Sequence, residues 1–463
     1  MNHDFQNANM FGFSALKKPP IKERLPHFRI PEVREHTLPN GLHILVIERH
    51  TLPKVSFRLG INLGSKYDPA EKKGLSELLS ASLKKGTSRR DYQTISDTIE
   101  SVGGELDSDV NEDGFFVFGE FFTDYLDLGL ELLSEISLSP VFPDQEVEKE
   151  RSKLIANLAN ENSSPQFLAR RRMIELLFQP HPYGCYKTEQ SLHNISRLDL
   201  QDFHRRYFVP HNSFLVFAGD IKLEEAVRKT EKYFGEWKGG PVDRPEFKLP
   251  GVADQPVVNV VDRPGSEQVN LLLGNRLFAR NHPDYHRMLV MNKILGGGGS
   301  GRLFLYLREE KGYTYGAYSS LNALKETGAW LANAEVRPEV TIDALKAFFE
   351  KFQEIKTEPV SSAELKNAKR YLVGSFPLKN ETPASIASLL LQQKLYGLPK
   401  DYWQKYAHLV DEVSSAEVRQ VAEKYIREQQ MAVVVVGDAK RLAGQLEKFG
   451  QVEVYDVQNR PVR

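Results

Sequence analysis

Apolar and polar residues alternate in two widely separated stretches of the chain. The apolar positions are Val55, Phe57, Leu59, Ile61 and Leu63 in the first stretch and Val269, Leu271 and Leu273 in the second. A period of two is typical of a strand that buries one face. The pattern therefore predicts a strand over 55–63 and another that ends before Gly274.

A helical pattern follows each of these strands. Leu75, Leu78, Leu79 and Leu83 fall at i, i+3, i+4 and i+8, which predicts an amphipathic helix within residues 72–85. Residues 286–295 predict a helix at the corresponding place in the second half. Further strands are expected over 115–122 and 329–336, and further helices over 126–136, 342–355 and 362–373.

One arrangement of helix and strand occurs twice. A helix ending near Tyr207 leads to an apolar strand that closes on Gly219-Asp220, and Tyr425 leads in the same way to Gly437-Asp438. The tyrosine and the glycine are 12 positions apart in both copies. Each copy is followed by a charged stretch that ends in Phe-Gly. Matching order and spacing indicate an internal duplication.

The duplication and the length of 463 residues predict two domains. We expect an extended tail over 1–35, a first domain over 36–240 and a second, related domain over 256–463. The Gly- and Pro-rich residues 241–255 form the expected linker. Adjoining strands mixed with helices favour an α+β fold, in which each domain has a mainly antiparallel sheet with helices on one face.

Composition excludes several classes of partner. Apolar residues make up 41% and charged residues 27% of the chain, as in ordinary globular proteins, and the net charge is −1. A nucleic-acid partner is therefore not expected. We expect the basic cluster 170–172 to be a solvated helix face. The single cysteine, Cys185, excludes an internal disulfide and fits a reducing compartment.

Targeting signals are not evident either. The first 35 residues contain no apolar run of signal-peptide length, and no arginine precedes Arg24. The longest strongly apolar run, Met431–Val436, is too short to cross a bilayer. A cytoplasmic protein without a membrane span is expected.

The segment from Gly74 to Thr87 resembles a frame found in the pitrilysin/insulinase family of zinc peptidases. That frame is G-L-x-H-x-x-E-H-x-L-x-x-G-T, with two histidine ligands and a general-base glutamate. In this chain the first histidine position is Glu77, the base position is Ser80 and the second histidine position is Ala81. Residues 147–161 resemble the second metal helix of the family, whose glutamate ligand falls on Asn157.

The resemblance implies that this chain binds no catalytic metal. Zinc in a catalytic site normally takes three protein ligands from His, Cys, Asp or Glu. Of the four degenerate positions only Glu77 offers such a donor. We also considered His282 and His286 as a substitute pair. No third ligand lies nearby in sequence, and a solvated helix start is the favoured interpretation of that segment.

A second signature of the family is retained. Residues 295–300 form a glycine-rich turn, and residues 307–315 match L-R-E-x-x-G-x-x-Y with Arg308 and Tyr315. In active members this arginine and tyrosine reach a zinc site in another domain, where they donate hydrogen bonds to the oxyanion and the peptide. The alternatives are an ion pair of Arg308 with Glu309 or Glu310 and half-buried packing of Tyr315.

The glycine-rich turn is expected to be a hinge or to contact the substrate. Its residues are Gly297, Gly298, Gly299 and Ser300. Glycine lets a backbone approach a bound peptide closely. The turn lacks the G-x-x-x-x-G-K-[ST] pattern, which argues against phosphate binding of the Walker type.

The resemblance therefore implies the non-zinc subunit of a heterodimeric zinc metallopeptidase. A sibling chain with an intact H-x-x-E-H would hold the zinc, and this chain, inactive alone, would supply Arg308 and Tyr315. The two would enclose unfolded peptides in a chamber, as a heterodimer or a dimer of heterodimers. The alternative is a non-catalytic scaffold or peptide-binding protein, like the core proteins of respiratory complex III.

Overall fold

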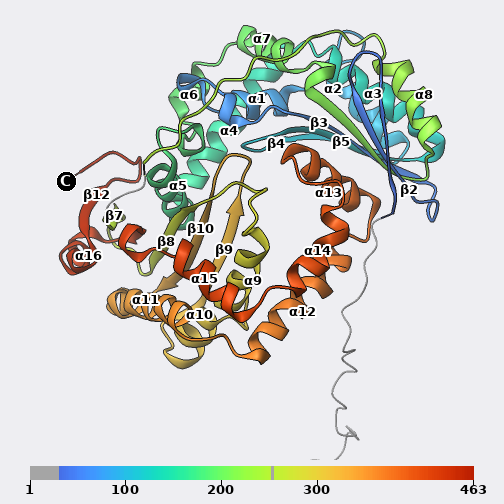
Figure 1. The fold of residues 1–463 in the computed structure, drawn as a ribbon. Helices are drawn as coiled ribbons and strands as arrows, with labels where there is room; N and C mark the ends of the chain where they lie inside the picture. The colour runs from blue at the N-terminus through green and yellow to red at the C-terminus, as the bar shows by residue number, and fades with distance from the viewer. Residues whose placement is uncertain (1–30, 252–254, 463) are drawn as a thin grey trace, which may run out of the picture.

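Two six-stranded sheets organise the computed structural model, which describes residues 31–251 and 255–462 (Figure 1). The first sheet contains β1 (Val33–Thr37), β2 (His43–Glu48), β3 (Lys54–Ile61), β4 (Glu105–Val110), β5 (Phe115–Phe122) and β6 (Ser213–Gly219). The second contains β7 (Val257–Asp262), β8 (Val269–Leu277), β9 (Thr314–Ala323), β10 (Gly328–Val336), β11 (Ala432–Gly437) and β12 (Gln451–Tyr455).

The two sheets share one topology. Their strand orders are β1-β2-β6-β3-β5-β4 and β12-β7-β11-β8-β10-β9. In each, the strand that ends in Gly-Asp, β6 or β11, runs parallel to one neighbour and antiparallel to the other. The two sheets differ in where their outermost strand lies in the sequence. Strand β1 comes from the start of its half, whereas β12 comes from the end of the chain. The predicted duplication is thus visible in the sheets.

Helices surround both sheets. Those of the first half are α1 (Leu75–Ser82), α2 (Tyr92–Ser101), α3 (Leu126–Leu138), α4 (Asp144–Ser163), α5 (Pro165–Phe178), α6 (Glu189–His193), α7 (Arg197–Tyr207) and α8 (Leu223–Phe234). Those of the second half are α9 (Tyr285–Leu295), α10 (Arg302–Phe304), α11 (Thr341–Thr357), α12 (Ser362–Lys379), α13 (Pro383–Leu395), α14 (Tyr402–Asp411), α15 (Ser415–Tyr425) and α16 (Ala439–Leu446). The expected α+β class of two related, mainly antiparallel units is confirmed.

Each half also lends one helix to the sheet of the other. Helix α5 packs on β8 and β11, and α13 packs on β3 and β6. In Figure 1 both helices lie between the upper and the lower part of the molecule. This exchange explains why every residue of β6 and β11 is buried: a strand covered on both faces is apolar throughout.

The exchange corrects the expectation for the basic cluster 170–172. Arg171 is buried, and the Arg172 guanidinium lies 3.6 Å from the centre of the Tyr455 ring. Arg172 also donates to the side-chain oxygen of Asn259 at 2.5 Å. Arg171 and Arg172 are therefore not part of a solvated face, because α5 is enclosed between the two halves and their stems pack there, whereas Arg170 is exposed as expected.

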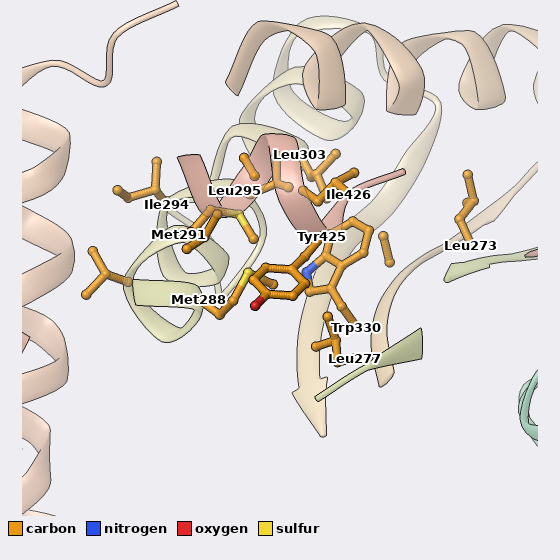
Figure 2. Packing of buried hydrophobic residues seen from close by; sticks show 14 of the residues in the cluster. Leu273, Leu277, Met288, Met291, Ile294, Leu295, Leu303, Trp330, Tyr425 and Ile426 are labelled. Atoms are coloured by element: carbon orange, nitrogen blue, oxygen red, sulfur yellow. The ribbon is translucent and has the colours of Figure 1, made fainter. Parts of the chain in front are cut away.

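The core of the second half forms around Trp330 (Figure 2). This side chain is fully buried and packs among the residues of β8, α9 and α15. Its indole N–H donates to the side-chain oxygen of Asn292 at 2.9 Å, so its polar atom is satisfied inside the core.

The chain between the two sheets takes no regular form over residues 235–251. The expected tail, 1–35, lies mostly outside the described residues, and its last three residues belong to β1. Across the described ranges, no helix has the length and apolar character needed to cross a membrane.

Candidate functional site

Helix α1, which carries three of the four degenerate metal positions, begins at a specialised turn. Gly74 has φ of +97°, and a Cβ there would lie 2.7 Å from the Leu192 side chain, so only glycine fits without strain. The Asp68 carboxylate accepts the backbone N–H groups of Gly74 and Ser76, each at 3.0 Å. Burial raises the pKa of Asp68 to about 7 against the opposing effect of Lys73.

The three positions on α1 lie on one cavity, but their chemistry differs from that of a zinc site. Both oxygens of Glu77 accept from the Lys187 ammonium at 2.7 Å. The Ser80 hydroxyl donates to the Ser108 hydroxyl at 3.2 Å, across to β4. Ala81 contributes only a methyl group. The cavity has a volume of about 510 Å³.

The fourth position does not join them. Asn157 is exposed on α4 and is not among the described residues that line the cavity, although Leu154 and Glu161 of the same helix are. Of the four positions, Glu77 alone offers a zinc donor, and its carboxylate is already paired with the Lys187 ammonium. In the described parts of the chain, no three His, Cys, Asp or Glu side chains are grouped to hold a metal ion. These residues do not fit a catalytic zinc ion.

The isolated chain should therefore retain far less than one equivalent of zinc after dialysis. Lys187 places a positive charge against the Glu77 carboxylate, and a cation would have to displace it. Metal content measured by plasma mass spectrometry tests this expectation. One tightly held equivalent, lost on replacing Glu77 with Gln, would contradict it.

Arg308 lies in a different part of the molecule, on a π-helical turn formed by Leu305–Glu310. Its Nε is 3.2 Å from a carboxylate oxygen of Glu309, and its guanidinium is 4.8 Å from the centre of the Phe304 ring. Its side chain is 46% exposed. The ion pair considered from sequence is present, but at such exposure it contributes little stability. Single π-turns occur often at functional sites.

Tyr315 is placed on β9 by a β-bulge. Tyr315 and Gly316 together lie opposite the single residue Glu335 of β10. Such a bulge redirects a side chain out of the regular alternation. Tyr315 is 86% exposed, the highest value among the exposed large hydrophobic residues of the described chain. The half-buried packing considered as an alternative is therefore absent at this residue.

The structure does not bring Arg308 and Tyr315 to the degenerate metal positions. Asn322, at the other end of β9, lines the cavity of Glu77. The seven residue steps from Tyr315 to Asn322 span roughly 23 Å at the usual rise of a strand. Tyr315 instead borders a separate surface hollow with Gln166 and Arg337. Any role for these donors at a zinc ion lies with a site outside this cavity.

The glycine-rich turn is tightly built at its start and open at its end. The Lys293 ammonium donates to the Gly297 carbonyl at 2.7 Å. A Cβ on Gly297 would lie 2.7 Å from the Lys293 backbone, and Gly298 has φ of +143°. Gly299 and Ser300 are exposed. The first two glycines are thus required by the backbone, whereas the last two residues present an accessible surface.

The proposed solvated helix start at His282 and His286 is wrong for His286. Helix α9 begins at Tyr285, and His286 is buried beside the rings of Tyr402 and Tyr406. Burial lowers its pKa to about 4. The His282 ring instead stacks on the Phe278 ring, with 4.3 Å between the ring centres. The two histidines therefore do not point toward a common ligand.

Sequence analysis missed a buried ionic network that joins the two halves. Lys66, 2% exposed at its side chain, lies 2.9 Å from Asp113 and 2.5 Å from Glu326. His181 contacts the other oxygen of Glu326 at 2.9 Å. The Tyr183 hydroxyl also donates to Asp113. The one signal in the sequence was the loop 181–185, which contains histidine, proline and tyrosine. That loop does not indicate which residues its side chains would contact.

This network makes the stability of the protein pH-dependent. Burial opposes ionisation of Glu326, but hydrogen bonds from His181 and Lys66 outweigh it and lower the pKa to about 2. The carboxylate therefore contributes stability that is complete above about pH 4.5 and is lost as the pH falls toward 2. The unfolding free energy of wild type minus that of Glu326→Gln should shrink over this window in denaturant titrations. A difference that is constant with pH would exclude the linkage.

Comparison with known proteins identifies the family to which this fold and sequence are similar. The sequence model described as "Insulinase (Peptidase family M16)" matches residues 43–186, and the model described as "Peptidase M16 inactive domain" matches residues 194–372. Together they cover more than half of the chain. An uncharacterized zinc protease of Mycobacterium leprae is 26% identical over 403 residues, which are 86% of this chain and 90% of that protein.

Other similar proteins differ in what their names say of activity. The protein named non-peptidase homolog YmxG of Helicobacter pylori is 23% identical, over 86% of this chain and 92% of its own. The structure of a peptidase M16 inactive domain from Pseudomonas fluorescens superposes with a TM-score of 0.82 at 25% identity, over 88% of this chain and 98% of that one. A protease from H. pylori superposes with 0.83 at 22% identity, over 88% and 99%. This chain therefore belongs to the insulinase family of peptidases, family M16.

Proposed function

We propose that this chain is the non-zinc-binding subunit of a heterodimeric zinc metallopeptidase that acts in the cytoplasm. A sibling chain carries H-x-x-E-H and the distal glutamate and holds the zinc. This chain supplies Arg308 and Tyr315 to that site, and its glycine-rich turn contacts the enclosed peptide. The two halves over 36–240 and 256–463 form half of the chamber wall.

The proposal rests on two exposed hydrogen-bond donors, Arg308 and Tyr315, to which the described part of the fold gives no structural role. Tyr315 stands out from a bulge with 86% of its surface exposed, and the Arg308 guanidinium contacts the exposed Glu309 carboxylate and the face of the Phe304 ring. Peptide hydrolysis at zinc builds negative charge on the carbonyl oxygen, which a phenol and a guanidinium can stabilise. The degenerate positions of this chain do not fit zinc, so the charge they would stabilise belongs to a partner's site.

A non-catalytic role is the second candidate. It is supported by the loss of ligands at Ser80, Ala81 and Asn157 and by the similarity to the protein named non-peptidase homolog. In that case the cavity beside Glu77 would hold peptides without cleaving them. Exposure of Arg308 and Tyr315 then has no catalytic meaning.

Reconstitution distinguishes the two candidates. The chain is expressed alone, with its sibling alone as a comparison, and both together, and cleavage of an unfolded peptide is measured with and without a chelator. The proposal expects co-purification and chelator-sensitive cleavage only in the mixture. Chelator-sensitive cleavage by this chain alone would overturn it, and a stable complex that cleaves no faster than the sibling alone would favour the scaffold.

A further inference from the structure

A second cavity lies next to the degenerate metal positions, between the two halves. It has a volume of about 340 Å³, near the lower end for sites that bind small ligands. Residues of β3, β5, β9 and α13 line it. Asp109, Asn111 and Asn322 line both this cavity and the one beside Glu77. The two cavities therefore adjoin along one row of polar side chains.

A buried cation lines this cavity without a counter-ion among the described residues. Arg280 is 7% exposed. It donates from Nη1 to the Tyr402 hydroxyl at 2.6 Å, and its guanidinium lies 3.7 Å from the centre of the Tyr285 ring. Over residues 31–251 and 255–462, no carboxylate lies within 4.0 Å of it. Removing an arginine from water without a paired anion is costly.

A second guanidinium lines the same cavity. Arg58 donates from Nε to the Ala384 carbonyl at 3.3 Å and lies 5.0 Å from the centre of the Phe118 ring. It too forms no ion pair with any described residue. Among the described lining residues, Asp109 alone carries a carboxylate. It is exposed and accepts the backbone N–H of Val110 at 2.8 Å. The lining thus carries two positive charges against one solvated negative charge.

We propose that this cavity binds the carboxylate of a peptide between Arg58 and Arg280. A guanidinium donates two parallel hydrogen bonds to a carboxylate, which would offset the desolvation of Arg280. Phe118 and Leu391 supply an apolar wall for the neighbouring side chain. The peptide continues past Asn111 and Asn322 into the cavity beside Glu77.

This inference deepens the proposed function, because it names the feature by which this chain holds its peptide. It rests on peptide binding and not on a zinc-bearing partner. Binding is therefore measured on the full-length chain alone, and cleavage by the mixed complex is a separate result. Absence of carboxylate recognition together with cleavage by the mixture would overturn the inference and leave the proposed function standing.

Three pools of degenerate tetrapeptides test it. The first has free C-terminal carboxylates, the second has C-terminal amides and no acidic residue, and the third is amidated with an internal glutamate. Peptides retained by the chain are quantified by mass spectrometry after ultrafiltration. The free-acid pool should bind about tenfold tighter than the neutral amide pool or more, as expected for hydrogen bonds to a charged group. The third pool tells a terminal carboxylate from a side-chain carboxylate.

Arginine variants locate the effect. Arg280→Gln and Arg58→Gln should each abolish most of the preference for acid over amide. Arg276→Gln, at a half-buried arginine that lines a different cavity, should keep it. Thermal unfolding verifies that each variant is folded. If Arg280→Gln does not fold, the test rests on the binding measured for Arg58→Gln. Equal binding of acid and amide pools, or retention of no pool, would overturn the inference.

Discussion

Replacing Tyr315 with phenylalanine should slow peptide cleavage by the reconstituted complex by about 100- to 1,000-fold while the complex stays assembled. The variant removes one hydroxyl, and this hydroxyl makes no hydrogen bond to another described residue of its own chain. Because Tyr315 is 86% exposed, the substitution leaves packing untouched. Removal of one oxyanion donor typically costs about 2.7–4 kcal/mol of transition-state stabilisation. The loss should appear in kcat, since the charge develops only in the transition state.

Arg308→Ala should act in the same direction, and two matched controls separate chemistry from surface effects. Tyr318→Phe changes another exposed tyrosine of β9. Arg419→Ala removes an arginine that, like Arg308, is about half exposed and pairs with a nearby glutamate. Both controls should retain full activity. If the Tyr315 and Arg308 variants cleave as fast as these controls, the roles proposed for them are excluded.

Replacing Asp113 with asparagine should destabilise the folded chain by about 1–3 kcal/mol, because it breaks a buried ion pair, although the Lys66 ammonium keeps its second carboxylate partner, Glu326. The Asp113 side chain is 0% exposed and lies 2.9 Å from the Lys66 ammonium. It also accepts the backbone N–H of Lys325 at 2.8 Å, which joins it to the second half. Asparagine keeps the shape but not the charge. Free energies of unfolding from urea titration measure the effect.

An exposed ion pair serves as the control for the loss of stability at Asp113. Asp401→Asn removes the partner of Lys405 on α14, where both side chains are more than half exposed. Such pairs contribute about 0–1 kcal/mol. A loss at Asp113 no larger than at Asp401 would show that the network joining the halves contributes little to stability.

Local patterns predicted most elements because period two and period 3.6 report burial of one face within a few residues. The strand expected over 115–122 coincides with β5, and the helix expected over 126–136 begins with α3. The apolar run before Gly437 became β11 for the same reason. At the candidate site, the residue types on α1 were sufficient to indicate that zinc ligands are missing, since that conclusion depends on chemistry and spacing alone.

Partners that are distant in sequence could not be predicted in this way. Lys187 neutralises Glu77 from 110 positions away, and Glu326 reaches Lys66 from 260. The burial of His286 depends on α14, more than 110 residues later in the chain. Nothing in the local pattern of either partner selects the other, because a charged or aromatic side chain at a given position suits many environments.

The sequence by itself determined the repeated order of elements behind the two sheets and the residue types at Glu77, Ser80, Ala81 and Asn157, from which the absence of zinc ligands is predicted. Each is a property of residue type and short spacing, and the roles of Arg308 and Tyr315 stay predictions. Only the tertiary structure decided that α5 and α13 are exchanged between the halves, that a bulge turns Tyr315 outward, and that Arg58 and Arg280 share a cavity. These features arise where surfaces from remote segments meet. Packing there is selected by the complementarity of whole faces, which periodicity along one segment does not encode.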